Sequence, residues 1–274
     1  MGKFDGFLLC TDMDGTLLTT DKRISEENKQ AIEYFKSEGG LFTFATGRTF
    51  EGANPIIEQY TPDIPMIAFN GAAIYDINKK EVLFSQAIDS NITKIVDLVA
   101  EKHPTAGIDI CTIKQSYFYR TNRVLEEHKH IERLPDSYID DYSQIQEKWL
   151  KIIFMVEPEE MSALRSLIEN SEYADMFEFV QSEMWYYEAL PKNTNKGTAL
   201  VELTKMLNIP LEKTIAIGDN GNDVEFVKKA GIGVAVANAV PELLDCADCI
   251  TVDNNSHAIK ALVEALDRSI LKFK

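Results

Sequence analysis

The chain of 274 residues is long enough to bury a sizeable core, in one large domain or in two modest ones. Its formal net charge of −16 at pH 7 disfavours nucleic acids and anionic membranes as partners. No apolar stretch approaches membrane-spanning length, and the segment Met1–Gly6 lacks the apolar region of a signal peptide. These features predict a cytoplasmic protein, in which an anionic substrate needs a local device such as a metal ion to be captured.

The first predicted element is a short buried strand that starts at Phe7 and ends in Asp12, Asp14 and Gly15. If the strand geometry persists, the two aspartates face the same side and lie close enough to share a metal ion. Ordinary turn chemistry is one interpretation, because Asp and Gly dominate turns. The other makes Asp12 a nucleophile toward a phosphoryl group and Asp14 its acid/base partner. The remaining strands decide between the two.

The next elements complete a strand, helix, strand unit. Ser25 caps a predicted helix that ends at Ser37, and the strand Leu41–Ala45 stops at Thr46. This order is typical of a parallel sheet, in which both strand ends meet at one edge. Thr46 should therefore lie beside Asp12, at the carboxyl edge where open α/β sheets bind ligands.

A third short strand is expected at Met66–Phe69, followed by a hairpin over 73–84. From about Ser85 to Leu190, hairpin pairs alternate with helices, which indicates an α+β layer inserted into the first domain. We expect helices near 91–101, 123–133 and 159–168, and strands near 108–113, 116–120, 151–156, 176–181 and 184–189. His128 and His130 lie in a charged stretch of this segment, which favours a solvated helix face.

The parallel-sheet pattern then resumes. Lys196 opens a predicted helix to Leu207, and further strands are expected at 232–236 and 249–251. A last helix is expected from Ala258 to Leu271. The strand over 214–217 ends in an acidic loop that contains Asp219, Asn222 and Asp223.

The four cysteines favour a reduced protein with mostly buried thiols. Cys246 and Cys249 have C-x-x-C spacing, which a zinc or redox site would also use. Such a site needs a second half-site or a thioredoxin-like context, and the sequence contains neither.

Four segments carry the chemistry, and they are Asp12-Met13-Asp14-Gly15-Thr16, Thr46, Lys196 and Gly218-Asp219-Asn220-Gly221-Asn222-Asp223. Together they resemble the haloacid dehalogenase (HAD) superfamily of phosphotransferases, whose ordered motifs are D-x-D-G-T, a Thr or Ser, a Lys and G-D-x-x-x-D. Three further segments extend the resemblance to the Cof-type branch, subfamily IIB, and they are Ala45–Arg48, Phe69–Ala72 and Asn195–Gly197. The resemblance covers nearly the whole chain.

The resemblance implies an α/β fold with a Rossmann-like core built on a parallel sheet, over 1–84 and 191–274. It implies an inserted α+β cap of the C2B type over 85–190, which selects the substrate. The implied enzyme is a phosphoric monoester hydrolase, a Mg²⁺-dependent phosphatase that acts on a small phosphorylated metabolite through an aspartyl phosphate. A sugar phosphate is the favoured substrate.

The resemblance also implies roles for individual residues. Asp12 would be the catalytic nucleophile and Asp14 the acid/base. The phosphate would be bound by Thr46, Gly47, Lys196 and Asn222. Mg²⁺ would be bound by Asp12, Asp14 through its backbone carbonyl, Asp219 and Asp223. Phosphoryl transfer needs such a cation, because a phosphate monoester brings negative charge toward a carboxylate.

Simpler interpretations stay open for single residues. Lys196 alone is typical of a solvated helix start, Asn222 could cap the helix before Val224, and Arg48 could face the substrate or pair with a surface acid. A phosphomutase, which passes the phosphoryl group to another sugar hydroxyl, is an alternative function. A non-enzymatic sensor of a phosphorylated metabolite is another. The sequence identifies neither the substrate, nor the cap residues that select it, nor the oligomeric state.

Overall fold

The computed structural model describes residues 2–269, which form two compact units. Unit 1 comprises the described parts of 1–47, 56–84 and 195–274, and unit 2 comprises 48–55 and 85–194. The helix α2 (Phe50–Ile57) begins among the residues of unit 2 and ends among those of unit 1. The domain boundaries expected from the sequence stay a prediction.

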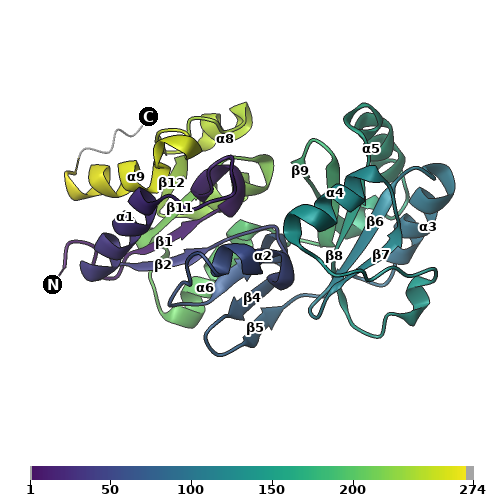
Figure 1. Cartoon of the computed structure of the whole chain (residues 1–274), viewed down its shortest axis with the longest axis horizontal. Coiled ribbons are helices and arrows are strands. Elements are labelled where there is room, and N and C mark those ends of the chain that lie inside the picture. Colours follow the sequence, from purple (N-terminus) through teal and green to yellow (C-terminus); the bar gives the residue numbers. More distant parts are fainter. Residues whose placement is uncertain (1, 270–274) are drawn as a thin grey trace. The chain divides into compact units, whose positions relative to one another are not determined.

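Unit 1 is built on a parallel sheet of five strands in the order β13-β12-β11-β1-β2 (Figure 1). The strands are β1 (Leu8–Thr11), β2 (Leu41–Phe44), β11 (Thr214–Gly218), β12 (Ile232–Ala235) and β13 (Cys249–Ile250). The central strand β1 pairs in parallel with both neighbours, Thr11 facing Phe44 on one side and Ile217 on the other. The carboxyl ends of β1, β2 and β11 therefore meet at one edge, as expected for a parallel sheet.

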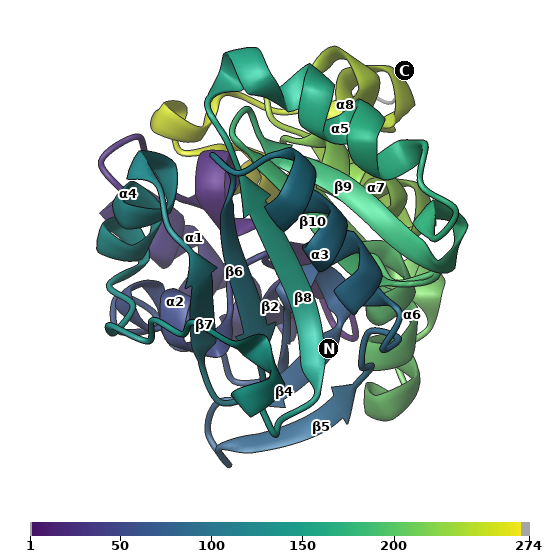
Figure 2. The ribbon, with the colours of Figure 1, turned by 90° about the vertical axis from the view of Figure 1, so that its right-hand side faces the viewer.

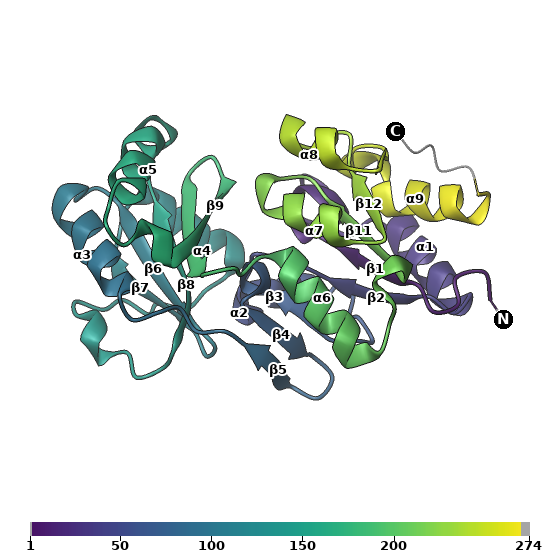
Figure 3. The same cartoon turned by 180° about the vertical axis from the view of Figure 1, so that it is seen from behind.

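Helices cover both faces of this sheet, which explains why its strands are apolar on both sides. Helix α1 (Glu26–Ser37) lies with α9 (Ala258–Asp267) toward the viewer in Figure 1. Helices α6 (Lys196–Leu207) and α7 (Val224–Lys229) lie against the opposite face, seen in Figure 3. The short helix α8 (Pro241–Cys246) packs on α7. The predicted end of the last helix at Leu271 lies outside the described residues.

The third strand lies where it is expected, as does the hairpin that follows it. β3 (Met66–Ala68) belongs to a separate antiparallel sheet with β4 (Ala73–Asp76) and β5 (Glu81–Ser85). A single bridge from Ala45 to Ile67 links it to the end of β2. The preceding helix α2 was not predicted, because its sequence contains glycine and proline, which both disfavour a helix interior.

The sheet of unit 2 is antiparallel, in the order β7-β6-β8-β10-β9. Its strands are β6 (Gly107–Thr112), β7 (Ser116–Arg120), β8 (Trp149–Met155), β9 (Phe177–Glu183) and β10 (Tyr186–Pro191). Helices α3 (Ile92–Lys102) and α5 (Met161–Glu169) lie across one face, as Figure 2 shows, and bury an apolar core against it. Helix α4 (Arg123–Glu132) packs on β6. The predicted α/β class, with a parallel-sheet core and an inserted α+β part, is confirmed.

Within residues 2–269, no helix combines the length and the apolar character needed to span a bilayer.

Candidate active site

The strand β1 ends at Thr11, and Asp12 begins a tight turn at the carboxyl edge of the sheet. The Asp12 backbone N–H donates to the carbonyl oxygen of Ile217 at 2.9 Å, which fixes it beside β11. The chain then turns through Met13–Leu17, where Gly15 has a φ of +75°. Glycine adopts this left-handed conformation without the steric cost that a Cβ brings. The strand geometry therefore stops one residue before Asp12.

This turn changes the expected direction of Asp14. The expectation that the two carboxylates lie close enough to share a metal ion depended on a continuing strand, and among the described residues the group of converging carboxylates does not include Asp14. The Asp14 carboxylate instead pairs with the ammonium group of Lys22 at 2.7 Å. The role expected of the Asp14 backbone carbonyl does not depend on this side chain and stays a prediction.

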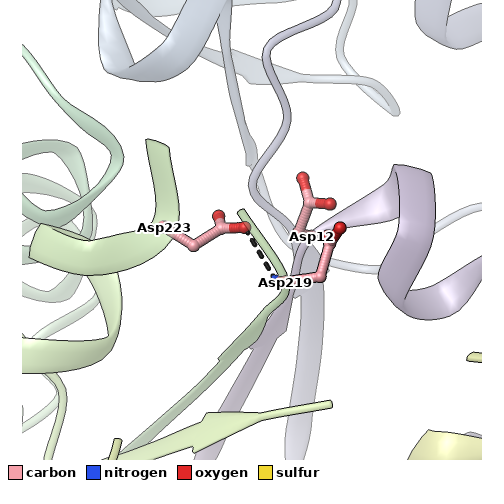
Figure 4. A group of neighbouring side chains, drawn as sticks. All are labelled: Asp12, Asp219 and Asp223. Carbon is pink, nitrogen blue, oxygen red and sulfur yellow. Dashed lines mark hydrogen bonds between the residues drawn. The ribbon is translucent and has the colours of Figure 1, made fainter. Parts of the chain in front are cut away.

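Three other carboxylates converge at the edge of the sheet (Figure 4). Oxygen atoms of Asp12, Asp219 and Asp223 lie within 4.8 Å of one another. Asp219 accepts a hydrogen bond from the hydroxyl of Thr16 at 2.8 Å. Asp223 accepts from the backbone N–H groups of Asp219 at 3.0 Å and Asn220 at 3.2 Å, so the acidic loop fixes its own carboxylate.

Lys196 lies between two of these carboxylates although it is 184 residues from Asp12 in the sequence. Its ammonium group is 2.6 Å from Asp12 and 2.7 Å from Asp223, and its side chain is fully buried. Asn195 caps helix α6, accepting from the N–H of Thr198, so the helix start is fixed where Lys196 begins. The interpretation of Lys196 as a solvated lysine is wrong.

The buried charges shift each other's titration. Burial raises the pKa of Asp12 well above its ordinary range, the Lys196 ammonium opposes this, and the charges of Asp223 and Asp219 add to it. Burial alone would lower the pKa of Lys196, but the charges of Asp12 and Asp223 outweigh it, so the pKa of Lys196 is raised. Lys196 therefore stays protonated at neutral pH. Three carboxylates around one ammonium leave negative charge to be balanced.

The residues expected to bind phosphate lie around the same edge. The N–H of Ala45 donates to the carbonyl oxygen of Thr11, at the end of β2. The next residue, Thr46, therefore lies just beyond β2, as Asp12 lies just beyond β1. A Cβ on Gly47 would lie 2.9 Å from Oδ1 of Asn70. The same Oδ1 accepts a hydrogen bond from the Asn222 side chain at 3.0 Å. Gly47 and the Asn222 side chain therefore both lie against Asn70.

Asn70 is the residue that sequence reasoning missed as a site residue. It is buried and has a φ of +53°, and its N–H donates to the carbonyl oxygen of Thr46 at 3.0 Å. Asn tolerates the left-handed conformation better than most residues, so an Asn-Gly pair after a strand is the signal that could have found it. The cap role expected of Asn222 falls to its neighbours, because Asn220 caps the turn Gly221–Asp223 and Asp223 stands at the cap position of α7.

Arg48 and the cysteines take simpler places. The guanidinium group of Arg48 donates to the carbonyl oxygen of Gly52 at 2.8 Å, in unit 2, and is buried. All four cysteines are free thiols, as expected, and the C-x-x-C pair belongs to no metal-binding group among residues 2–269.

Gly71 positions Lys196 and supports a first prediction. It has a φ of +103°, and a Cβ there would overlap the carbonyl oxygen of Asn195. We expect Gly71→Ala to lower the free energy of unfolding by about 1–3 kcal/mol, because both strain and overlap result. Chemical denaturation measures this. Gly39→Ala is the control. Gly39 also has a positive φ, of +89°, but a Cβ there would lie near Asp5 and not near Asn195. Only Gly71→Ala should also lower catalytic activity, and equal activities would contradict the positioning role.

The donor set fits a hard divalent cation. Carboxylate oxygens are the ligands that Mg²⁺ prefers, and a site with three of them near one lysine retains net negative charge. Asp12, Asp219 and Asp223 supply these oxygens from the ends of two adjacent strands. The arrangement can bind a cation and an anionic group side by side.

Comparison with known proteins gives this geometry a family context. The haloacid dehalogenase-like hydrolase family matches residues 9–262. The Bacillus subtilis protein YxeH is 30% identical over 94% of this chain and 97% of its own. The 5-amino-6-(5-phospho-D-ribitylamino)uracil phosphatase YcsE of the same organism is also 30% identical, over 90% of each chain. The solved HAD subclass IIB sugar phosphatase BT4131 has a TM-score of 0.83 over 95% of this chain and 99% of its own, at 20% identity, a likeness of fold.

Proposed function

The chain belongs to the haloacid dehalogenase-like hydrolase family, and on that premise we propose that it is a Mg²⁺-dependent phosphatase of small phosphomonoesters. The observation that carries the proposal is Lys196, buried between Asp12 and Asp223 with Asp219 within reach. A nucleophilic carboxylate beside a fixed ammonium suits an incoming phosphoryl group, whose charge the ammonium offsets.

Asp12 and Asp14 divide the chemistry between them. A carboxylate oxygen of Asp12 attacks phosphorus, and the leaving alkoxide takes a proton from Asp14 as its bond to phosphorus breaks. Asp14 then accepts a proton from water, whose oxygen attacks the aspartyl phosphate and restores the Asp12 carboxylate as phosphate leaves. For the first proton transfer the Asp14 carboxylate must turn away from Lys22, with which it pairs at 2.7 Å.

The other residues bind and orient. Thr46, the Gly47 N–H, Lys196 and Asn222 would donate hydrogen bonds to the phosphoryl oxygens. Asp12, the Asp14 backbone carbonyl, Asp219 and Asp223 would hold Mg²⁺, which when bound supplies the positive charge that phosphate and carboxylates together require. Asn70, which binds Asn222 at 3.0 Å, would orient that donor.

We assign the substrate to the small phosphorylated metabolites with hydroxylated leaving groups, sugar phosphates among them. The names of YcsE and BT4131, a phosphoribityl compound phosphatase and a sugar phosphatase, support this class. The cytoplasm is the proposed compartment, because four free thiols suit a reducing environment. The inserted residues 85–190 are proposed as the cap that selects the leaving group.

Removal of the cation tests this proposal. We expect chelation with EDTA to lower phosphate release from p-nitrophenyl phosphate at least about a hundredfold, and added Mg²⁺ to restore it, because the carboxylates then lose their counter-charge. Asp219→Asn should raise the Mg²⁺ concentration needed for half-maximal rate. Asp63→Asn, at an exposed ion pair with Lys36, is the control. Undiminished hydrolysis in EDTA would contradict the cation requirement.

Analysis of the products separates the alternatives. A phosphatase releases inorganic phosphate from sugar phosphates, whereas a mutase isomerises them without accumulating it. Binding of phosphorylated metabolites without any turnover in saturating Mg²⁺ would favour a sensor.

A further inference from the structure

The turn Met13–Leu17 that follows Asp12, the aspartate turn, contains a glycine that its surroundings require. Gly15 has a φ of +75°, and a Cβ there would overlap Oδ2 of Asp219. Only glycine fits so close to that carboxylate in this conformation, but glycine also leaves the backbone most free to rotate. The peptide group before Gly15 carries the Asp14 carbonyl oxygen, a cation ligand in the proposed function. The turn therefore needs a support that its own sequence does not supply.

A side chain from a distant part of unit 1 holds the other peptide group of this glycine. The amide Nδ2 of Asn238 donates to the Gly15 carbonyl oxygen at 2.9 Å, across 223 residues of sequence. Asn238 lies in the loop 236–240 between β12 and α8. The strand β11 lies between β12 and β1 in the sheet, and the Asn238 side chain spans this gap.

The loop that carries Asn238 is bonded to the acidic loop after β11. The N–H of Val236 donates to the carbonyl oxygen of Gly218 at 3.2 Å, and the N–H of Val240 donates to that of Asp219 at 2.8 Å. The backbone is thus fixed on both sides of Asn238 to the backbone that carries the Asp219 carboxylate. Asn238 therefore ties the aspartate turn to the strand end from which Asp219 projects.

A second asparagine orients the first. The backbone N–H of Asn254 donates to Oδ1 of Asn238 at 2.9 Å. Because an N–H bonds only the oxygen of an amide, the amide nitrogen of Asn238 must face Gly15. Asn254 is itself buried, and its Nδ2 donates to the carbonyl oxygen of Leu18 at 2.8 Å, directly after the aspartate turn. Asn238 is exposed, yet both ends of its amide are bonded and its orientation is fixed.

These contacts restrict the part of the turn where the cation ligands meet. The two peptide groups of Gly15 share one Cα, so a hydrogen bond that holds the second also limits rotation of the first. The Thr16 hydroxyl, which donates to Oδ1 of Asp219 at 2.8 Å, restricts the next residue. Mg²⁺ demands near-ideal octahedral geometry, with oxygen ligands at about 2.0–2.1 Å, so a small displacement of one ligand lowers its affinity.

We propose that Asn238 is a positioning residue for the cation site. By holding the Gly15 peptide group, it keeps the Asp14 carbonyl oxygen in place relative to the Asp219 carboxylate, and Asn254 orients it for this role. The inference rests on the proposed function and deepens it, because it assigns part of the cation affinity to a residue that is not itself a ligand.

Calorimetric titration with Mg²⁺ in the absence of substrate tests this role. We expect Asn238→Ala to raise the dissociation constant for Mg²⁺ about threefold to tenfold, since a hydrogen bond that holds a ligand is lost. The Mg²⁺ concentration for half-maximal phosphate release should rise by a similar factor, whereas KM for the substrate in saturating Mg²⁺ should not change. Asn238→Ser, whose hydroxyl is too short to reach Gly15, should weaken Mg²⁺ binding in the same direction.

Asn255→Ala is the matched control. Asn255 is exposed like Asn238, and its side chain joins the same two parts of the chain, because Oδ1 accepts from the N–H of Thr20 at 2.9 Å and Nδ2 donates to the Thr20 hydroxyl at 3.0 Å. This contact lies beyond the aspartate turn, so the Mg²⁺ affinity of Asn255→Ala should equal that of the wild type. Equal affinity in the wild type and Asn238→Ala overturns the inference. An equal loss in Asn238→Ala and Asn255→Ala also overturns it, since the contacts would then only join the two segments.

The same measurements separate this inference from the proposed function. A wild type that binds no Mg²⁺ overturns the positioning role together with the cation requirement. A wild type that binds Mg²⁺ but releases no phosphate from p-nitrophenyl phosphate or sugar phosphates contradicts the phosphatase function alone, and the affinities of the variants still decide the role of Asn238.

Discussion

Asp12→Asn is expected to lower phosphate release from p-nitrophenyl phosphate and from sugar phosphates by at least about a thousandfold. The reason is that an amide cannot attack phosphorus as a carboxylate does, and loss of a nucleophile removes the covalent route entirely. Steady-state assays in saturating Mg²⁺ measure this. A fully active variant would end the proposal that Asp12 is the nucleophile.

The same variant should fold normally, which separates chemistry from stability. Burial disfavours the charged form of Asp12, and an uncharged asparagine removes that desolvation cost. Lys196 keeps its partner Asp223 at 2.7 Å. We therefore expect the thermal midpoint not to fall below that of the wild type. Asp63→Asn, at a surface ion pair, should leave both activity and midpoint unchanged.

Lys196→Met is expected to have the largest effect on stability. It leaves Asp12 and Asp223 buried without their shared ammonium, and removal of one partner of a buried ion pair costs about 3–5 kcal/mol. In the wild type the charge of Lys196 opposes the effect of burial on Asp12. Loss of the ammonium should therefore raise the pKa of Asp12 further. The deficit should therefore shrink as pH falls and Asp12 takes up a proton. Chemical denaturation at neutral and mildly acidic pH measures it.

Two further variants test this explanation. If the cost arises from an uncompensated carboxylate, the double variant Lys196→Met with Asp12→Asn should lose less free energy of unfolding than the sum of the losses in the two single variants. Lys205→Met is the control on the same helix, because Lys205 is 67% exposed and pairs with Glu202 at the surface. We expect it to change stability by no more than about 0.5 kcal/mol. A similar loss in both lysine variants would contradict the role of the buried pair.

Some features could not be predicted because they depend on segments remote in sequence. Asn70 joins Gly47 to Asn222 through a side-chain contact that spans 152 residues. His128 appeared solvated because its neighbours are charged, yet the opposite side of its helix faces Asp109.

The sequence by itself determined the class of fold and the residues from which the site is assembled. Short apolar strands that end in Asp12, Thr46 and Asp219 specify a parallel sheet, and the rules for strand connection bring their ends to one edge. Only the tertiary structure decided which charges are buried and which side chains meet, as with Lys196 and Asp109. The physical reason is that alternation and periodicity are local, whereas desolvation and hydrogen bonding depend on what packs against each face.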